Sequence, residues 1–208
     1  MAHIPDGVLS LPVLLGGGAL AAAGVGLGLR ALDDRAIPRV ALLSAVFFAT
    51  SLLSIPVGPS SVHLLLGGLM GVLLGVGIFP AVLVALALQA VLFGFGGLTT
   101  LGVNTVNIAL PGAVVGLALG PLIRRQTRPG RAGALAGAGA AAAVFGTGAL
   151  VAGALWLSAP EYTPVARVLL VTYLPLALVE AAVTAIVVGF LTRVEPAALA
   201  PALKMRET

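Results

Sequence analysis

Apolar segments about as long as a membrane is thick recur along almost the whole chain, and they constrain its fold more than any other feature. A helix needs roughly 20 apolar residues to cross the hydrocarbon core of a bilayer. Of the 208 residues, 60% are hydrophobic and only 9% are charged, whereas soluble domains carry about 25% charged residues. A soluble domain of this size cannot enclose so much apolar surface. We therefore predict an all-α integral membrane protein, with residues 1–208 forming a single polytopic membrane domain.

About seven segments are predicted to form transmembrane helices. They cover approximately residues 11–29, 39–56, 63–79, 80–94, 104–123, 132–157 and 166–191. The third and fourth segments form one long apolar run, which we divide at Phe79-Pro80. Proline has no backbone N–H and disfavours helix at the residue before it, so a break is expected there. One kinked span with a re-entrant piece is the alternative.

The basic residues indicate the orientation of the chain. With seven spans and the N-terminus outside, ten of the 11 Lys and Arg residues lie on the cytoplasmic side, as the positive-inside rule requires. These ten are Arg30, Arg35, Arg39, Arg124, Arg125, Arg128, Arg131, Arg193, Lys204 and Arg206. Six spans would separate the clusters at 30–39 and 124–131. We therefore expect the C-terminus to be cytoplasmic. Docking to a cytoplasmic partner or to anionic lipid is an alternative role for these clusters.

Several functional classes are excluded by what the sequence lacks. It contains no cysteine, and therefore no disulfide or thiolate metal site. It contains no GxxxxGK[ST] loop, so the chain does not hydrolyse ATP itself. HExxH and GxSxG motifs are also missing. The basic pI of about 10.7 follows from the cytoplasmic clusters and does not indicate a nucleic-acid partner. We predict a transport subunit rather than an enzyme, without an organic cofactor.

The two histidines of the chain, His3 and His63, are predicted to lie at the same outer face. Ala2 is small, so removal of Met1 is expected. The α-amine of Ala2, the amide nitrogen of His3 and its ring Nδ1 can then chelate one ion in a plane, with His63 as the fourth ligand. Four nitrogens in a square plane suit Ni(II) or Cu(II). If Met1 is retained, the N-terminus can provide four nitrogens without His63. An interfacial His63 bonded to a loop carbonyl, and a His3 without function, are the alternatives.

Polar and glycine residues gather between Gln89 and Asn107, in a stretch that separates two apolar segments. The sequence Pro5-Asp6-Gly7 predicts a turn that folds the N-terminal segment back into the bundle. Two interpretations of the polar stretch remain open: a loop that covers a binding site, and a glycine-rich turn with helix-capping Thr and Asn. The residues expected in a site-covering loop are Asp6, Gly96, Gly97, Thr99 and Asn104.

Glu180 is the one acidic residue deep within a predicted span. An intramembrane carboxylate usually faces the bundle interior and marks a functional site, so Gln89 and Glu180 form a candidate intramembrane polar site. The alternative is a structural carboxylate that is hydrogen-bonded to Thr or Asn on a neighbouring helix, or held neutral by burial.

Glycines at intervals of four residues predict close helix packing. The sets are Gly24 and Gly28, and Gly67, Gly71 and Gly75. This spacing places small residues on one helix face. Packing within the chain is the favoured interpretation, and a face for a partner protein is the alternative.

Several of these motifs together resemble the CbiM/NikM family. These proteins are the substrate-binding membrane components of energy-coupling-factor (ECF) transporters for cobalt and nickel. His3-Ile4-Pro5-Asp6-Gly7 resembles the family's N-terminus, and residues 61–68 around His63 resemble its second histidine motif. Residues 93–104 resemble its glycine-rich loop, and Glu180 resembles a late acidic motif.

The resemblance implies an ATP-driven importer of Ni²⁺ or Co²⁺ in the plasma membrane of a prokaryote. The metal would be held by the N-terminal amine, the amide and ring nitrogens of His3, and the ring of His63. A transmembrane coupling subunit, two cytoplasmic ATPase subunits and a small accessory membrane protein are the implied partners. The family typically begins Met-His, whereas Ala2 intervenes here. A metal-independent transporter or channel subunit and a purely structural membrane subunit are the alternative functions.

Overall fold

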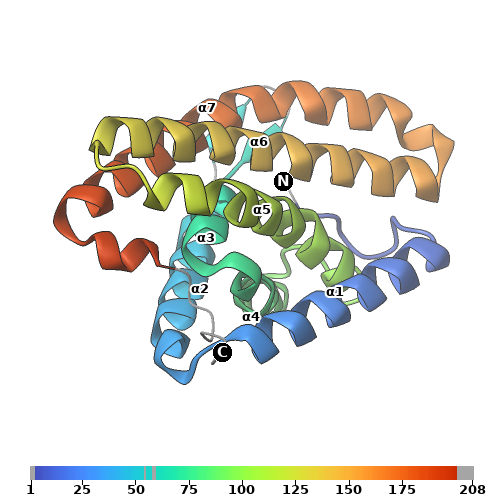
Figure 1. Cartoon of the computed structure of the whole chain (residues 1–208). Coiled ribbons are helices and arrows are strands. Elements are labelled where there is room, and N and C mark those ends of the chain that lie inside the picture. Colours follow the sequence, from blue (N-terminus) through green and yellow to red (C-terminus); the bar gives the residue numbers. More distant parts are fainter. Residues whose placement is uncertain (1–2, 54, 58–59, 201–208) are drawn as a thin grey trace.

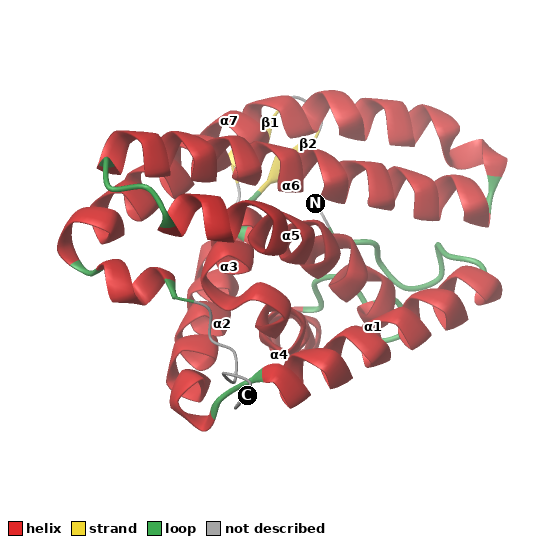
Figure 2. Ribbon diagram, viewed as in Figure 1, coloured by secondary structure: helices red, strands yellow, loops and turns green. Residues whose placement is uncertain are grey.

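A computed structural model describes residues 3–53, 55–57 and 60–200, and it is nearly all helical (Figures 1 and 2). The α-helices are α1 (Leu11–Ala31), α2 (Ile37–Ser51), α3 (Gly67–Leu74), α4 (Ile78–Phe93), α5 (Leu101–Arg124), α6 (Pro129–Ser158) and α7 (Thr163–Val194). Short 3-10 helices are η1 (Asp34–Ala36), η2 (Gly75–Gly77), η3 (Pro160–Tyr162) and η4 (Pro196–Leu199). Strands β1 (Ile55–Val57) and β2 (Ser60–Val62) complete the described elements.

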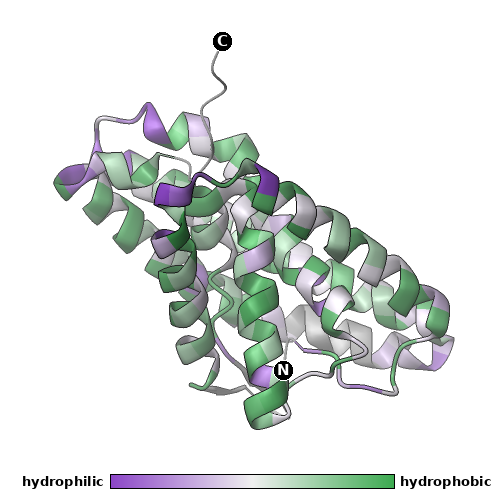
Figure 3. Cartoon of the chain, turned by 90° about the horizontal axis from the view of Figure 1, so that it is seen from below, coloured by the Kyte–Doolittle hydropathy of each residue, from purple (hydrophilic) through white to green (hydrophobic). Residues whose placement is uncertain are grey.

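Within the described residues, five helical segments are long and apolar enough to cross a membrane. They are Leu11–Ala31, Gly67–Phe93, Leu101–Arg124, Pro129–Ser158 and Thr172–Val194. Large apolar side chains on their outer faces are exposed, such as Leu27 on α1 and Ile186 on α7. Figure 3 shows hydrophilic residues mostly near the ends of the helices. The prediction of a helical membrane protein is confirmed. α2, with 15 residues, is not among these five segments.

The prediction of an entirely helical chain is wrong at one place. β1 and β2 pair antiparallel, with Ile55 opposite Val62 and Val57 opposite Ser60. The predicted span 39–56 therefore ends early, because α2 stops at Ser51. Pro56 interrupts helical hydrogen bonding, and β-branched residues such as Ile55 and Val57 favour an extended backbone.

The break between the third and fourth predicted spans is also displaced. We expected it at Phe79-Pro80, but α3 ends at Leu74 and α4 begins at Ile78. Gly75 adopts φ 56° and ψ −128°, a conformation that residues with a side chain rarely adopt. Pro80 lies in the first turn of α4, where a missing N–H has no helical partner to lose.

α3 lies at the centre of the bundle, and all eight of its residues are buried (Figure 1). Gly71 packs so closely on α5 that a Cβ atom there would overlap the carbonyl oxygen of Gly112. On α1, Gly24 contacts Phe79, and Gly28 contacts Val76 and Pro80. The interpretation of these glycines as packing positions within the chain is confirmed.

α6 and α7 lie side by side as an antiparallel pair (Figure 1). A Cβ atom at Gly133 would come within 2.5 Å of the carbonyl oxygen of Ala185, and one at Gly137 within 2.7 Å of that of Ala181. This close backbone approach fixes α7, and with it the position of Glu180, relative to the bundle.

We expect Gly71→Ala to destabilise the protein, because the new methyl group has no space between α3 and α5. Overpacking of a core typically costs about 1–3 kcal/mol. Gly26→Ala on α1 is the matched control, because nothing lies within 4 Å of a Cβ atom there. Thermal unfolding in detergent should show a lower midpoint for Gly71→Ala alone. Equal midpoints for the two variants would contradict this packing.

Candidate functional site

The two histidines come together from distant parts of the chain. His3 belongs to the segment before α1, and His63 directly follows β2. Their rings stack with centroids 4.8 Å apart and an interplanar angle of 17°. Both residues are buried, with 6% and 5% of their surface exposed. The structure thus brings the two predicted ring ligands into direct contact.

One nitrogen of His63 is engaged and the other is free. Nδ1 lies 3.0 Å from the carbonyl oxygen of Leu64. A carbonyl only accepts hydrogen bonds, so this contact requires the proton to be on Nδ1. Nε2 then carries a lone pair, and it is buried without a hydrogen-bond partner. A neutral imidazole with a free Nε2 is a common metal ligand.

Neither ring nitrogen of His3 has a hydrogen-bond partner, although both are buried. Burial and, to a smaller extent, the adjacent His63 lower the pKa of His3 from 6.5 to about 3. The ring is therefore neutral at physiological pH, which is the form that binds metal ions. Buried polar atoms usually have partners, so three free nitrogens in one ring pair point to a ligand.

Asn104 of α5 anchors the N-terminal segment beside His63. Its Oδ1 accepts from the backbone N–H of Ile4 at 3.0 Å, and its Nδ2 donates to the Ile4 carbonyl at 3.0 Å. The Thr100 hydroxyl donates to the same carbonyl at 2.7 Å. Because His3 directly precedes Ile4, these bonds also hold His3 in place.

Asp6 ties the same segment to the loop between α4 and α5. Its carboxylate accepts from the backbone N–H groups of Leu98 and Thr99 at 3.2 and 3.0 Å, and from that of Thr100 at 3.3 Å. It also accepts from the Thr99 hydroxyl at 2.5 Å. The hydroxyl and these amides lower the pKa of Asp6. Asp6 therefore stays ionised and clamps the loop.

Gly96 and Gly97 allow the loop to approach the N-terminal segment. Gly96 has φ +76°, and a Cβ atom there would lie 3.3 Å from the Cβ of His3. A Cβ atom at Gly97 would overlap the Asp6 carboxylate. All five residues predicted for a site-covering loop thus lie around the His3 segment. Thr100 and Asn104 bond to Ile4, and Thr100 makes no side-chain capping bond to α5.

Glu180 of α7 contacts the backbone that directly follows His63. Its Oε1 accepts from the backbone N–H of Leu65 and, at 2.8 Å, from that of Leu66. Oε2 is buried without a partner. The donors are backbone amides, which no sequence pattern marks, and not the Thr or Asn that one form of the structural alternative expected.

Gln89 and Glu180 are not joined by a hydrogen bond in the described part of the chain. Both amide atoms of Gln89 are buried without a partner. The backbone carbonyl of Gln89 accepts from the N–H of Phe95 at 3.3 Å, at the start of the glycine-rich loop. Gln89 therefore lies at the C-terminal end of α4, under the loop that Asp6 clamps.

A metal site here needs nitrogens beyond the side chains. Within residues 3–53, 55–57 and 60–200, no three His, Asp or Glu side chains gather as a metal-binding group. The two imidazoles supply at most two ligands. Further nitrogens would come from the backbone and the N-terminus. Ala2, predicted as a ligand through its amine, lies outside the described residues.

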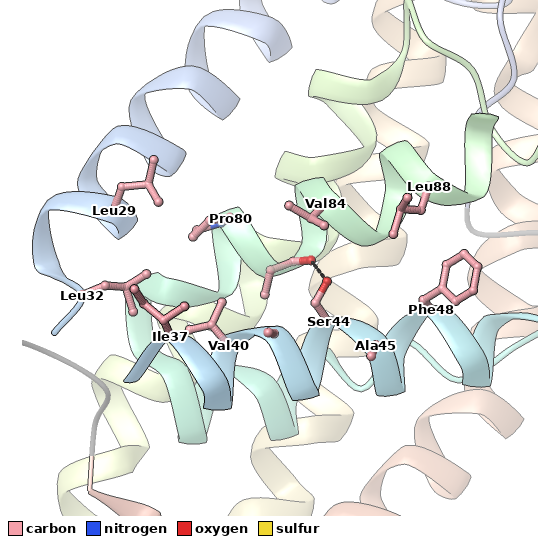
Figure 4. Close-up of a pocket in the computed structure, with 12 residues that line it drawn as sticks. Leu29, Leu32, Ile37, Val40, Ser44, Ala45, Phe48, Pro80, Val84 and Leu88 are labelled. Atoms are coloured by element: carbon pink, nitrogen blue, oxygen red, sulfur yellow. Dashed lines mark hydrogen bonds between the residues drawn. The ribbon is translucent and has the colours of Figure 1, made fainter. Parts of the chain in front are cut away.

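The apolar grooves are poorer candidates for a site. One of about 460 Å³ lies between α1, α2 and α4, lined by residues such as Leu29, Val40 and Val84 (Figure 4). The Ser44 hydroxyl on its wall already donates to the Ala81 carbonyl at 2.8 Å (Figure 4). A second groove of about 520 Å³ between α1, α5 and α6 contains Asn107 and otherwise mainly apolar or glycine residues. Neither groove presents a metal-ligating side chain.

Several known proteins are similar to this chain. Residues 3–198 match the family model described as "Cobalt uptake substrate-specific transmembrane region". A "Putative metal transport protein" of Haemophilus influenzae is 38% identical over 93% of this chain and 95% of its own length. "Cobalt transport protein CbiM" of Sorangium cellulosum is 35% identical over 93% of this chain and 92% of its own. The "Fused nickel transport protein NikMN" of Rhodobacter capsulatus is 36% identical over 56% of this chain and 35% of its own.

A solved structure shares the fold. The crystal structure of a truncated transition metal transporter matches with a TM-score of 0.69 and 25% identity, over 91% of this chain and 97% of that one.

Asn104→Leu should release the N-terminal segment. The substitution leaves the buried N–H and C=O of Ile4 with fewer partners, at about 1–3 kcal/mol per unsatisfied group. We expect at least about 10-fold faster hydrogen exchange at the Ile4 amide, since 1.4 kcal/mol corresponds to tenfold. Asn107→Leu, one turn further along α5, is the matched control, because the Nδ2 of Asn107 has no partner. Equal exchange at Ile4 in both variants would contradict the anchor.

Proposed function

The chain belongs to the CbiM family of cobalt uptake transmembrane regions, and we propose that it captures Ni(II) or Co(II) for an importer. It is a multi-pass membrane protein of the prokaryotic plasma membrane. Its relatives are named as transport proteins for cobalt, nickel or metals. The alternatives are a metal-independent transporter or channel subunit and a purely structural subunit.

The observation that carries this proposal is the pair of buried, neutral imidazoles with free nitrogens. The cargo ion is bound by Nε2 of His63, the free nitrogen of a ring whose Nδ1 bonds to Leu64. It is also bound by Nδ1 and the amide nitrogen of His3, and by the amine of Ala2 after removal of Met1. Four nitrogens in a plane favour nickel slightly over cobalt.

The two rings lie nearly parallel, with centroids 4.8 Å apart and planes inclined by 17°. In this proposal the ion lies at the free nitrogens of this ring pair. Asn104 and Asp6 hold the segment that carries His3 while the ion binds.

Energy for transport comes from partner subunits in this proposal. The sequence contains no phosphate-binding loop of its own. The resemblance to energy-coupling-factor transporters supports a transmembrane coupling subunit, two cytoplasmic ATPase subunits and a small accessory membrane protein. The chain itself performs no covalent chemistry.

The topology proposed for this role has seven crossings, with the N-terminus outside and the C-terminus inside. α3 runs from the His63 end to η2, where Gly77 lies against Leu32 at the end of α1. α4 then returns, from Pro80 beside Gly28 to the loop where Gly96 lies beside His3. The interrupted segment 67–93 thus passes from the histidine end to the opposite end and back. This return supports two crossings rather than one.

The positions of the basic residues support the same topology. The connections α1–α2 and α5–α6 and the end of α7 carry Arg30, Arg35, Arg39, Arg124, Arg125, Arg128, Arg131 and Arg193. Arg39 donates to the carbonyl of Ala200 at 2.7 Å, so the end of the described chain lies near the α1–α2 connection. Gly189 of α7 contacts Pro129 at the start of α6. These ends lie together, as a cytoplasmic face requires.

The purified protein should bind one Ni(II) or Co(II) ion in a calorimetric titration. Loss of His63 removes one ligand and leaves a weaker site, so His63→Ala should weaken binding at least about 10-fold. An N-terminal extension that blocks the Ala2 amine should do the same. Mass spectrometry of the N-terminus should show that Met1 is absent from the protein that is titrated. No site for either ion in the folded, processed protein would overturn the metal-capture proposal, and normal uptake after replacement of both histidines would favour a metal-independent transporter.

Single cysteines test the seven crossings, because the natural chain contains none. In intact cells, a membrane-impermeant thiol reagent should label Leu98→Cys in the α4–α5 loop and Glu161→Cys before α7. Thr127→Cys between α5 and α6 should react only after the membrane is permeabilised. Protection of Leu98→Cys in intact cells would contradict the return of α4 to the outer face.

A further inference from the structure

We propose that Glu180 is a positioning residue for the metal site, which it serves by fixing the backbone that presents His63. The inference rests on the proposed role of His63 as a ligand. Glu180 itself does not reach the ion in this assignment. It acts from α7 through one peptide group, and its side chain is fully buried.

The Leu64–Leu65 peptide group links the carboxylate to the imidazole. Its N–H, that of Leu65, donates to Oε1 of Glu180. Its C=O, that of Leu64, accepts from Nδ1 of His63 at 3.0 Å. A peptide group is planar, so the direction of its N–H also sets the direction of its C=O. Glu180 therefore orients the carbonyl that holds the proton on Nδ1 and leaves Nε2 free.

A second bond holds the next residue in an unusual conformation. Leu66 donates its N–H to the same Oε1 at 2.8 Å. It has φ 50°, the only positive φ of a non-glycine residue in the described ranges. Leu66 immediately precedes α3 and has no side-chain cap. A carboxylate at the start of a helix accepts from its free N–H groups and interacts favourably with its dipole. Glu180 thus satisfies the N–H of the residue that precedes α3 and stabilises the turn that follows His63.

The position of the Glu180 carboxylate is fixed by the close packing of α7 on α6. Glu180 directly precedes Ala181, whose carbonyl lies against Gly137 of α6. Metal-ligating histidines are commonly oriented by a partner on their second nitrogen, and loss of such partners typically costs about 10–100-fold in metal affinity. Here the partner on Nδ1 is a backbone carbonyl, and Glu180 in turn orients that carbonyl.

Three substitutions of Glu180 distinguish the effect of losing the hydrogen-bond acceptor from the effect of changing the side chain's length. Glu180→Gln keeps an oxygen that accepts from both amides. Glu180→Asp keeps the carboxylate but shortens its reach by one methylene, and Glu180→Leu removes the acceptor. Thr184→Val, one turn further along α7, is the matched control, because the buried Thr184 hydroxyl has no partner. Each variant is titrated with Ni(II), and the tautomer of His63 in the metal-free protein is measured by ¹⁵N NMR.

We expect Ni(II) affinity to fall about 10–100-fold in Glu180→Asp and Glu180→Leu, and His63 to lose its preference for the Nδ1–H tautomer. Glu180→Gln and Thr184→Val should keep the affinity and the tautomer of the wild-type protein. The tautomer measurement distinguishes positioning from general stabilisation, which would leave His63 unchanged. If Glu180→Leu does not fold, Glu180→Asp and Glu180→Gln still compare a displaced acceptor with one that keeps its position.

Wild-type affinity and tautomer in Glu180→Asp would overturn the inference, and so would equal losses in Glu180→Gln and Glu180→Asp. In both cases the metal-capture proposal stands, provided that the wild-type protein binds Ni(II) and His63→Ala binds it at least about 10-fold more weakly. Absence of Ni(II) binding by the wild-type protein would instead reject the proposed function.

Discussion

The reciprocal hydrogen bonds between Asn104 and the backbone of Ile4 are the interaction on which the candidate site depends. Residues at a chain terminus are usually poorly ordered unless they are tied down. Here one amide side chain on a long helix satisfies both polar groups of Ile4, and Asp6 adds a second attachment to the loop after α4. His3 is thereby held against His63, 60 positions further along the sequence. Without this attachment, the N-terminal segment would not hold His3 beside His63.

A bilayer explains how the remaining structure supports this arrangement. Backbone polar groups at membrane depth need partners within the protein, because lipid offers none. The irregular backbone between β2 and α3 meets this requirement through the Glu180 carboxylate. At the break after α3, Gly28 of α1 lies against the carbonyl of Val76. Small residues let α3, α5, α6 and α7 pack closely. This packing places Glu180 of α7 beside the backbone that it bonds. The side chains of Asn104 and Glu180 thus hold the two backbone segments that carry His3 and His63.

The sequence predicted the helices and the meeting of His3 with His63, because both leave side-chain patterns. Apolar runs specify membrane helices, and the polar stretch around Asn104 marks the loop that covers the N-terminal segment. The break between α3 and α4 was misplaced since Pro80 and Gly75 both disfavour helix, and only the structure shows which residue turns the chain. The partner of Glu180 was missed because it consists of two backbone amides, which have no residue preference. The role of Ala2 stays a prediction.

X-ray absorption spectroscopy of the Ni(II)-loaded protein tests the central claim most directly, because it reports the atoms around the ion. A site built from the N-terminus, His3 and His63 predicts a shell of nitrogen donors, with outer-shell scattering from two imidazole rings. The His63→Ala protein should show scattering from one ring only. An oxygen-dominated shell without imidazole scattering would contradict metal capture by the two histidines.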